Sequence, residues 1–73
     1  MLSFELTESG TVIQILCDTE GLTLLKRRLD DLQKFDHIHL RTAANGGNEL
    51  DEKNPLGEPT IGEVIITKFD FVE

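Results

Sequence analysis

Apolar and polar residues alternate at the start of the chain. Leu2, Phe4 and Leu6 are each separated by one polar residue. A period of two is typical of a β-strand that turns one face to water. The segment Glu8-Ser9-Gly10 is typical of a tight turn, and residues 11–17 after it are rich in β-branched side chains. These patterns predict an antiparallel hairpin over residues 2–17.

A helical repeat follows the hairpin. Four leucines recur at a spacing of three or four residues: Leu22, Leu25, Leu29 and Leu32. This spacing places them in one stripe along a helix. Asp18 or Thr19 precedes the repeat and can accept a hydrogen bond from a free N–H group of the first helical turn. We therefore expect a helix over about residues 20–35.

Two more strands are expected after the helix. Alternation over residues 37–42 directs Ile38 and Leu40 to one face, and His37, His39 and Arg41 to the other. Residues 43–60 contain several turn-forming residues and no clear period, so they predict a long loop. Long loops in compact domains are often either functional or flexible. Residues 61–72 are again rich in apolar residues and predict the fourth strand.

The resulting order is ββαββ, in a single domain over residues 1–73. This order predicts an α+β fold with a four-stranded, mainly antiparallel sheet and one helix packed on one face. The order of the strands within the sheet stays open. The second and fourth strands have apolar residues on both faces, although a single helix covers only one. A second copy of the chain, the long loop or a partner protein would cover the other face. A homodimer is one of these options, because so short a chain buries little apolar surface.

The charge balance limits the possible partners. Fourteen acidic residues against seven basic ones give a net charge of −7. This charge disfavours nucleic acid and anionic membranes as partners. It favours a basic protein partner, although an acidic surface also serves solubility alone.

The cell compartment is inferred from the one cysteine and from the start of the chain. Cys17 has no second cysteine to pair with, and a single thiol is typical of a reducing compartment. Residues 1–5 have no basic and apolar targeting pattern, and no apolar run approaches the ~20 residues that span a bilayer. We expect a cytoplasmic protein.

The pair His37 and His39 raises the question of a metal site. Neutral imidazole is a common metal ligand, but a zinc site needs further ligands, for which Asp36 or Glu49 would be the nearest choices. The alternative is a pair of partly exposed histidines that bond water or carboxylates. We favour this alternative and expect neither a metal nor another cofactor.

Catalysis has little support in the sequence. Cys17 and a histidine could form a nucleophile and a base, but Cys17 ends an apolar strand, where a buried and inert thiol is common. Asp51 and Glu52 lie in a polar loop and are expected to be solvated. Residues 44–50 resemble a phosphate-binding loop only in their glycines, since the GxxxxGK[ST] pattern is missing. We expect a binding protein and no enzyme.

Two adjacent motifs resemble a known family. The segment His37-Ile38-His39-Leu40-Arg41-Thr42, followed by Gly46-Gly47-Asn48-Glu49-Leu50, resembles the immunity protein 32 family of bacterial polymorphic toxin systems. That family has an H-x-H-L-x-T strand that runs into a G-G-N-E-L motif. The resemblance covers about residues 20–67. One departure is Ala44-Asn45, which stands where the family often has an aromatic residue, frequently tryptophan.

The resemblance implies a cytoplasmic protein that binds a cognate toxin and neutralises it. The matched positions imply binding residues at His37, His39, Arg41, Asn48 and Glu49. The acidic loop adds three candidates, Asp51, Glu52 and Glu58. Because nucleases are basic proteins that bind phosphate, carboxylates could occupy such a cleft, so we expect a basic, nuclease-like toxin.

Two alternatives stay open beside toxin binding. The chain could be a small dimeric interaction module without a toxin partner or, less favoured, a metal-binding protein that uses its histidines. Gly46, Gly47 and Asn48 could also serve only to shape the loop. Asparagine tolerates the left-handed conformation, so we expect a structural role for Asn48 more than direct contact with a partner.

Overall fold

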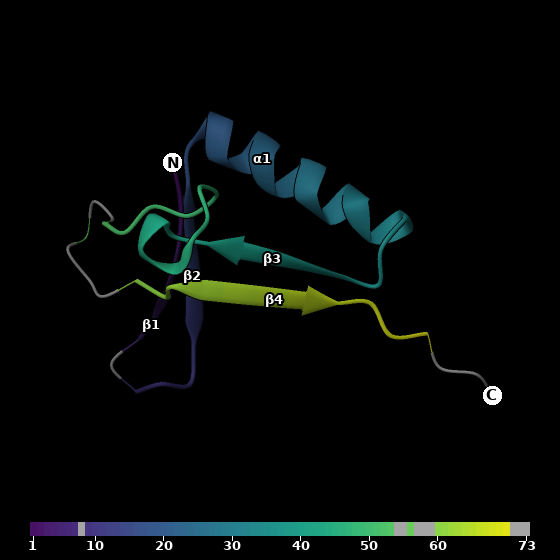
Figure 1. Cartoon of the computed structure of the whole chain (residues 1–73). Helices are drawn as coiled ribbons and strands as arrows, with labels where there is room; N and C mark the ends of the chain where they lie inside the picture. The colour runs from purple at the N-terminus through teal and green to yellow at the C-terminus, as the bar shows by residue number, and fades with distance from the viewer. Residues whose placement is uncertain (8, 54–55, 57–59, 71–73) are drawn as a thin grey trace.

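A computed structural model describes residues 1–7, 9–53, 56 and 60–70. The elements follow the order β1 (Leu2–Leu6), β2 (Ile13–Cys17), α1 (Thr19–Asp30), β3 (His37–Arg41) and β4 (Glu63–Thr67) (Figure 1). Two short 3₁₀ helices are η1 (Asp31–Gln33) and η2 (Ala43–Asn45). The α+β class and the ββαββ order are confirmed. No helix in these ranges is long and apolar enough to cross a membrane.

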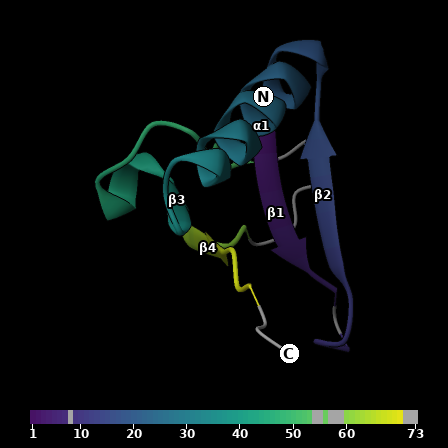
Figure 2. The ribbon, with the colours of Figure 1, turned by 90° about the vertical axis from the view of Figure 1, so that its right-hand side faces the viewer.

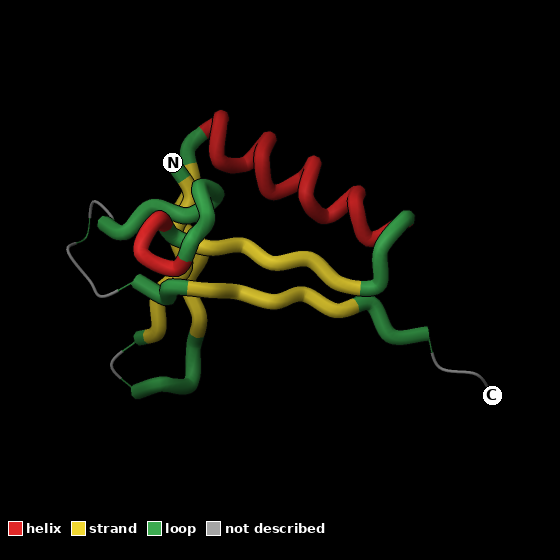
Figure 3. Tube along the Cα trace, viewed as in Figure 1, coloured by secondary structure: helices red, strands yellow, loops and turns green. Residues whose placement is uncertain are grey.

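The four strands form two separate antiparallel pairs, β1–β2 and β3–β4. The two pairs run in crossing directions in Figure 1. We had expected one four-stranded sheet. Within the described ranges, a single bridge from Glu5 to Thr60 runs from β1 to the segment before β4, whereas the bridge from Thr42 to Leu50 lies inside the β3–β4 connection. Figure 3 shows that the described parts of the connection between β3 and β4 are loop apart from η2. The fourth strand ends at Thr67, short of the expected residue 72, and residues 71–73 lie outside the described part of the chain.

The outer edge of β1 explains why the sheet divides. Asp51 N donates to Leu2 O (2.8 Å), and Ile61 N donates to Phe4 O (2.7 Å). Leu2 N in turn donates to the side chain of Asp51, at 2.9 Å from Oδ2. The middle and the end of the β3–β4 connection therefore occupy the edge at which a third strand would pair.

The helix α1 begins at the expected place and ends earlier than expected. Asp18 is the N-cap residue, and its Oδ1 accepts a hydrogen bond from Gly21 N (2.8 Å). The helix ends at Asp30 instead of near residue 35, because the chain tightens into η1. Lys34 N and Phe35 N then both donate to Asp31 O, at 3.0 and 2.9 Å.

The hydrophobic core is small. Its buried cluster consists of Leu2, Phe4, Leu40 and Leu50, with further side chains packed against it from α1 and β4. Only half of the predicted leucine stripe packs inward, since Leu25 of α1 and Leu32 of η1 are partly buried whereas Leu22 and Leu29 are 43% and 41% exposed. The core therefore lies at the crossing of the two strand pairs and under part of α1.

The strand β2 lies outside this core. Figure 2 shows β1 between β2 and the rest of the molecule. On β2 and the residue before it, Val12, Ile13 and Ile15 are exposed to 54%, 59% and 47%. Cys17 is also exposed, so the buried thiol expected from the sequence is wrong. The reason is that β1, not β2, covers the core.

Candidate functional site

The outer face of β3 presents the alternating residues that the sequence predicted. Ile38 and Leu40 are buried, so His37, His39 and Arg41 lie on the opposite face. The strand register places Arg41 opposite Glu63 of β4.

Glu63 is the central acceptor on this face. Its Oε2 accepts a hydrogen bond from Arg41 Nε at 2.6 Å and lies 2.8 Å from His39 Nδ1. These bonds, from Arg41 first and then from His39, hold the pKa of Glu63 below its ordinary value. Our sequence interpretation had not included Glu63. Only the cross-strand register, which pairs it with Arg41, identifies it.

His37 has a carboxylate of its own. Its Nδ1 lies 2.7 Å from Asp36 Oδ1, and this hydrogen bond lowers the pKa of Asp36. The two imidazole rings pack edge to face with centroids 5.1 Å apart. The basic groups on this face of β3 are therefore already paired with carboxylates of the same chain.

The two histidines, considered above as possible metal ligands, have separate partners. Their Nδ1 atoms bond two different carboxylates, Asp36 and Glu63. Glu49, which we considered as a further ligand, instead accepts hydrogen bonds from the backbone N–H groups of Arg41 in β3 and of Asn48 in the loop. Across the described ranges, no group of three or more His, Cys, Asp or Glu side chains is placed to hold a metal ion.

The loop after η2 contains the two glycines of the second motif. Gly46 has φ of +86°, in the left-handed region, where glycine is favoured. Gly47 is required for a different reason, since a Cβ atom there would lie 2.4 Å from Arg41 Cβ and 2.8 Å from Arg41 O. The paired glycines thus turn the chain and bring it back against β3.

Asn48 does not take the conformation that we had considered for it. In the described part of the chain no residue other than glycine has a positive φ. The glycines make the turn, and Asn48 is left exposed. Its backbone N–H donates to Glu49 Oε2 (3.1 Å).

The Glu49 carboxylate ties this loop to β3. Its Oε2 also accepts from Arg41 N at 3.3 Å. Burial raises the pKa of Glu49, but hydrogen bonds from the N–H groups of Asn48, Glu49 and Arg41 outweigh burial, so the net pKa is lowered. Glu49 is therefore a fixed negative charge beside the end of β3.

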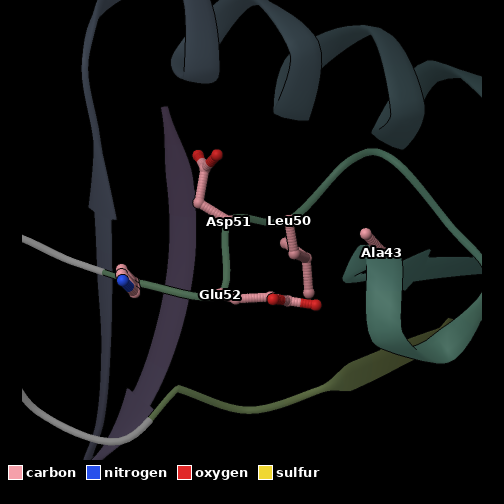
Figure 4. A pocket seen from close by; sticks show the side chains of 5 residues that line it. Ala43, Leu50, Asp51 and Glu52 are labelled. Atoms are coloured by element: carbon pink, nitrogen blue, oxygen red, sulfur yellow. The ribbon is translucent and has the colours of Figure 1, made fainter.

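Asp51 and Glu52 are held in the same way and remain exposed. Besides the bond from Leu2 N to Asp51, Ala44 N donates to Glu52 Oε1 at 2.7 Å. The two side chains point in different directions (Figure 4). They line a shallow hollow of about 350 Å³ together with Ala43, Leu50 and Lys53.

A second hollow, of about 260 Å³, brings α1 into the site. Glu20 and Arg27 of α1 line it together with Asn48 and Glu49 of the loop. Leu2, which bonds Asp51, is also in its wall. We call Glu20, Glu49, Asp51 and Glu52 the acidic surface. Sequence reasoning had missed Glu20, because only the fold brings the start of α1 beside the loop.

The predicted binding residues thus fall into two neighbouring groups. His37, His39 and Arg41 lie on β3, whereas Asn48, Glu49, Asp51 and Glu52 lie in the loop; the bond from Arg41 N to Glu49 joins the groups. Glu58 lies outside the described residues. Comparison of the chain with protein-family models, with curated proteins and with solved structures gives no match.

Proposed function

We propose that this chain binds a basic bacterial toxin through the acidic surface and neutralises it by occlusion. The observation that supports the proposal is that backbone N–H groups fix three loop carboxylates, Glu49, Asp51 and Glu52. The resemblance to the immunity protein 32 family supplies the class of partner, a cognate toxin of a polymorphic toxin system. Binding takes place in the cytoplasm and requires no catalytic residue and no cofactor.

The fixed carboxylates favour binding for an energetic reason. Ordering a flexible side chain at an interface costs about 0.5–1.5 kcal/mol. The backbone bonds order these side chains before the partner arrives, so less of this cost remains. Because the carboxylates of Asp51 and Glu52 diverge, the surface suits several basic side chains of a protein better than one small ion.

The net charge of −7 adds an effect on rate. Opposite potentials on two proteins accelerate their encounter, most strongly at low salt. A nuclease-like toxin holds phosphates in a basic cleft, and carboxylates can take the place of those phosphates. The His37, His39 and Arg41 face adjoins the acidic surface and extends the contact.

The test is an association-rate measurement with the toxin-like product of a neighbouring gene. The variant Glu49→Gln/Asp51→Asn/Glu52→Gln removes three negative charges but keeps an acceptor oxygen at each position. We expect its association rate to fall about tenfold at low salt, and the difference from the original chain to shrink as salt rises. A pull-down from cells expressing the neighbouring genes, at low and high salt, identifies the partner.

The matched control is Asp30→Asn/Asp31→Asn/Asp70→Asn, which removes the same number of charges outside both the acidic surface and the His37, His39 and Arg41 face. The control is expected to change the rate much less. Equal effects of both triple variants would mean that only net charge matters and would contradict a localised contact. Recovery of the chain alone in the pull-down would contradict the toxin partner.

A further inference from the structure

The backbone of β2 has an open edge. Thr7 N donates to Val12 O, and Asp18 N donates to Met1 O, both at 3.0 Å. In an antiparallel pair, hydrogen-bonded and non-hydrogen-bonded positions alternate. With the observed register, Gln14 and Leu16 therefore bond β1, and the backbone groups of three residues point away from it: Ile13, Ile15 and Cys17.

These outward groups have no backbone partner within the described ranges. The outer edge of β1 differs, since Asp51 and Ile61 bond it. The outer edge of β3 is also occupied, because Leu50 N donates to Arg41 O (3.1 Å) and an Arg28 guanidinium N–H donates to His39 O (3.3 Å). A strand edge with free N–H and C=O groups is a template for adding another strand.

We propose that the edge of β2 pairs with β2 of a second copy of this chain, so that the two hairpins form one continuous four-stranded sheet. Charge favours this occupant. Residues 10–17 contain no acidic, basic or proline residue in a chain of net charge −7, so two copies meet here without opposing like charges. A basic partner would instead be drawn to the acidic surface.

One register between the two copies pairs all three of these residues of one copy with the same three residues of the other. It is antiparallel, with a two-fold axis at Ile15. Ile15 then lies opposite Ile15 of the second copy, and Ile13 lies opposite Cys17. Six backbone hydrogen bonds form, and the exposed side chains of Ile13 and Ile15 (59% and 47%) pack across the axis. Asp18 lies opposite Val12, so no two carboxylates face each other.

The open edge of β4 is the less suitable of the two. Thr42 N donates to Gly62 O, and Lys68 N donates to Asp36 O. By the same alternation, the backbone groups of Glu63, Ile65 and Thr67 point away from β3. Glu63 is charged, and Lys68 follows the strand. Charged residues on an edge strand hinder pairing with another strand. Ile65, which is 56% exposed, therefore provides a matched control for Ile13.

Disulfide formation tests the register. Opposite residues of a hydrogen-bonded antiparallel pair have Cα atoms about 5.5 Å apart, within the range of a disulfide. The variant Ile13→Cys should form a covalent dimer with the native Cys17 of the second copy under mild oxidation. The double variant Ile13→Cys/Cys17→Ser and the original chain should not form a covalent dimer. In each of these proteins the cysteines of the two copies lie about 13 Å apart along the strands. Equal yields from all three proteins would overturn the proposal.

Sedimentation of the chain alone tests the dimer without a covalent bond. We expect a dimer at micromolar concentration for the original chain and for Ile65→Lys, and a monomer for Ile13→Lys, with circular dichroism showing that each protein is folded. A monomeric original chain at 100-fold higher concentration, about 100 μM, would overturn the proposal, as would dissociation by Ile65→Lys but not by Ile13→Lys. Neither result depends on a toxin.

Discussion

At the scale of single residues, the motif Gly46–Leu50 is explained largely by the shape of its loop. Gly46 provides the left-handed turn and Gly47 permits close approach to Arg41. Glu49 accepts backbone hydrogen bonds, and Leu50 is 5% exposed in the core. Only Asn48 points to solvent without such a role for its side chain. The motif therefore builds the scaffold of the acidic surface, and its carboxylates follow from that scaffold.

We predict that Gly47→Ala is more damaging than alanine at Gly46 or at Gly10, whose φ angles are +86° and +70°. A Cβ at position 47 would overlap Arg41, and overpacking costs about 1–3 kcal/mol. Gly46→Ala and Gly10→Ala meet no atom within 4 Å, so each incurs only the left-handed strain of about 1–2 kcal/mol. Urea unfolding gives the three free energies. A smaller loss for Gly47→Ala than for Gly10→Ala would contradict the close approach.

At the scale of elements, the β3–β4 pair is joined on its outer face by Glu63. Arg41 and His39 both bond this carboxylate from the neighbouring strand. Cross-strand pairs of opposite charge stabilise a two-stranded sheet, and within the described residues no third strand joins β3 and β4. The same pairs occupy the histidines that resembled a metal site in the sequence.

We predict an acid-dependent loss of stability that depends partly on Glu63. Because folding lowers the pKa of Glu63 below 4.5, the unfolded chain binds the proton more readily. The stabilisation is complete above pH 4.5 and is lost as pH falls through the lower folded pKa. Glu63→Gln should therefore be less stable at pH 7 and decline less steeply in acid.

Urea unfolding midpoints between pH 3 and pH 7 measure this difference. Asp70→Asn, at an exposed position, serves as the control and should follow the original chain. Parallel pH curves for the original chain and Glu63→Gln would show that Glu63 is not responsible. Some acid dependence should persist in the variant, since folding also lowers the pKa values of Asp18, Asp36 and Glu49.

At the scale of the whole molecule, the chain has two surfaces of opposite character. The acidic surface contains four carboxylates around two hollows. The edge of β2 is uncharged and apolar. A small core leaves both surfaces uncovered, so the fold can present one to a basic protein and the other to its own copy.

We predict that salt acts on the two associations in opposite directions. Screening weakens attraction between an acidic surface and a basic partner, but it also weakens repulsion between two copies of net charge −7. The dimer fraction should rise between about 20 and 300 mM NaCl while the partner's affinity falls. Sedimentation and binding isotherms measure the two trends. A dimer that dissociates as salt rises would contradict an uncharged interface.

Alternation and the helical repeat, read from the sequence, determined the elements. Leu2, Phe4 and Leu6 predicted β1, the capping candidates Asp18 and Thr19 predicted the start of α1, and alternation predicted which face of β3 is buried. These features are local, since they depend on the periods of strands and helices and on capping chemistry. The carboxylates of the loop could also be named from the sequence, because the acidic residues follow one another closely along the chain.

Only the tertiary structure decided how these elements meet. The division into two strand pairs depends on Asp51 and Ile61, which reach the edge of β1 from far along the chain. Contacts between distant residues also pair Glu63 with Arg41 and place Glu20 beside Glu49. They leave β2 and Cys17 exposed. A local pattern shows which face of an element is apolar, but the element that covers that face is chosen by contacts between residues distant in sequence.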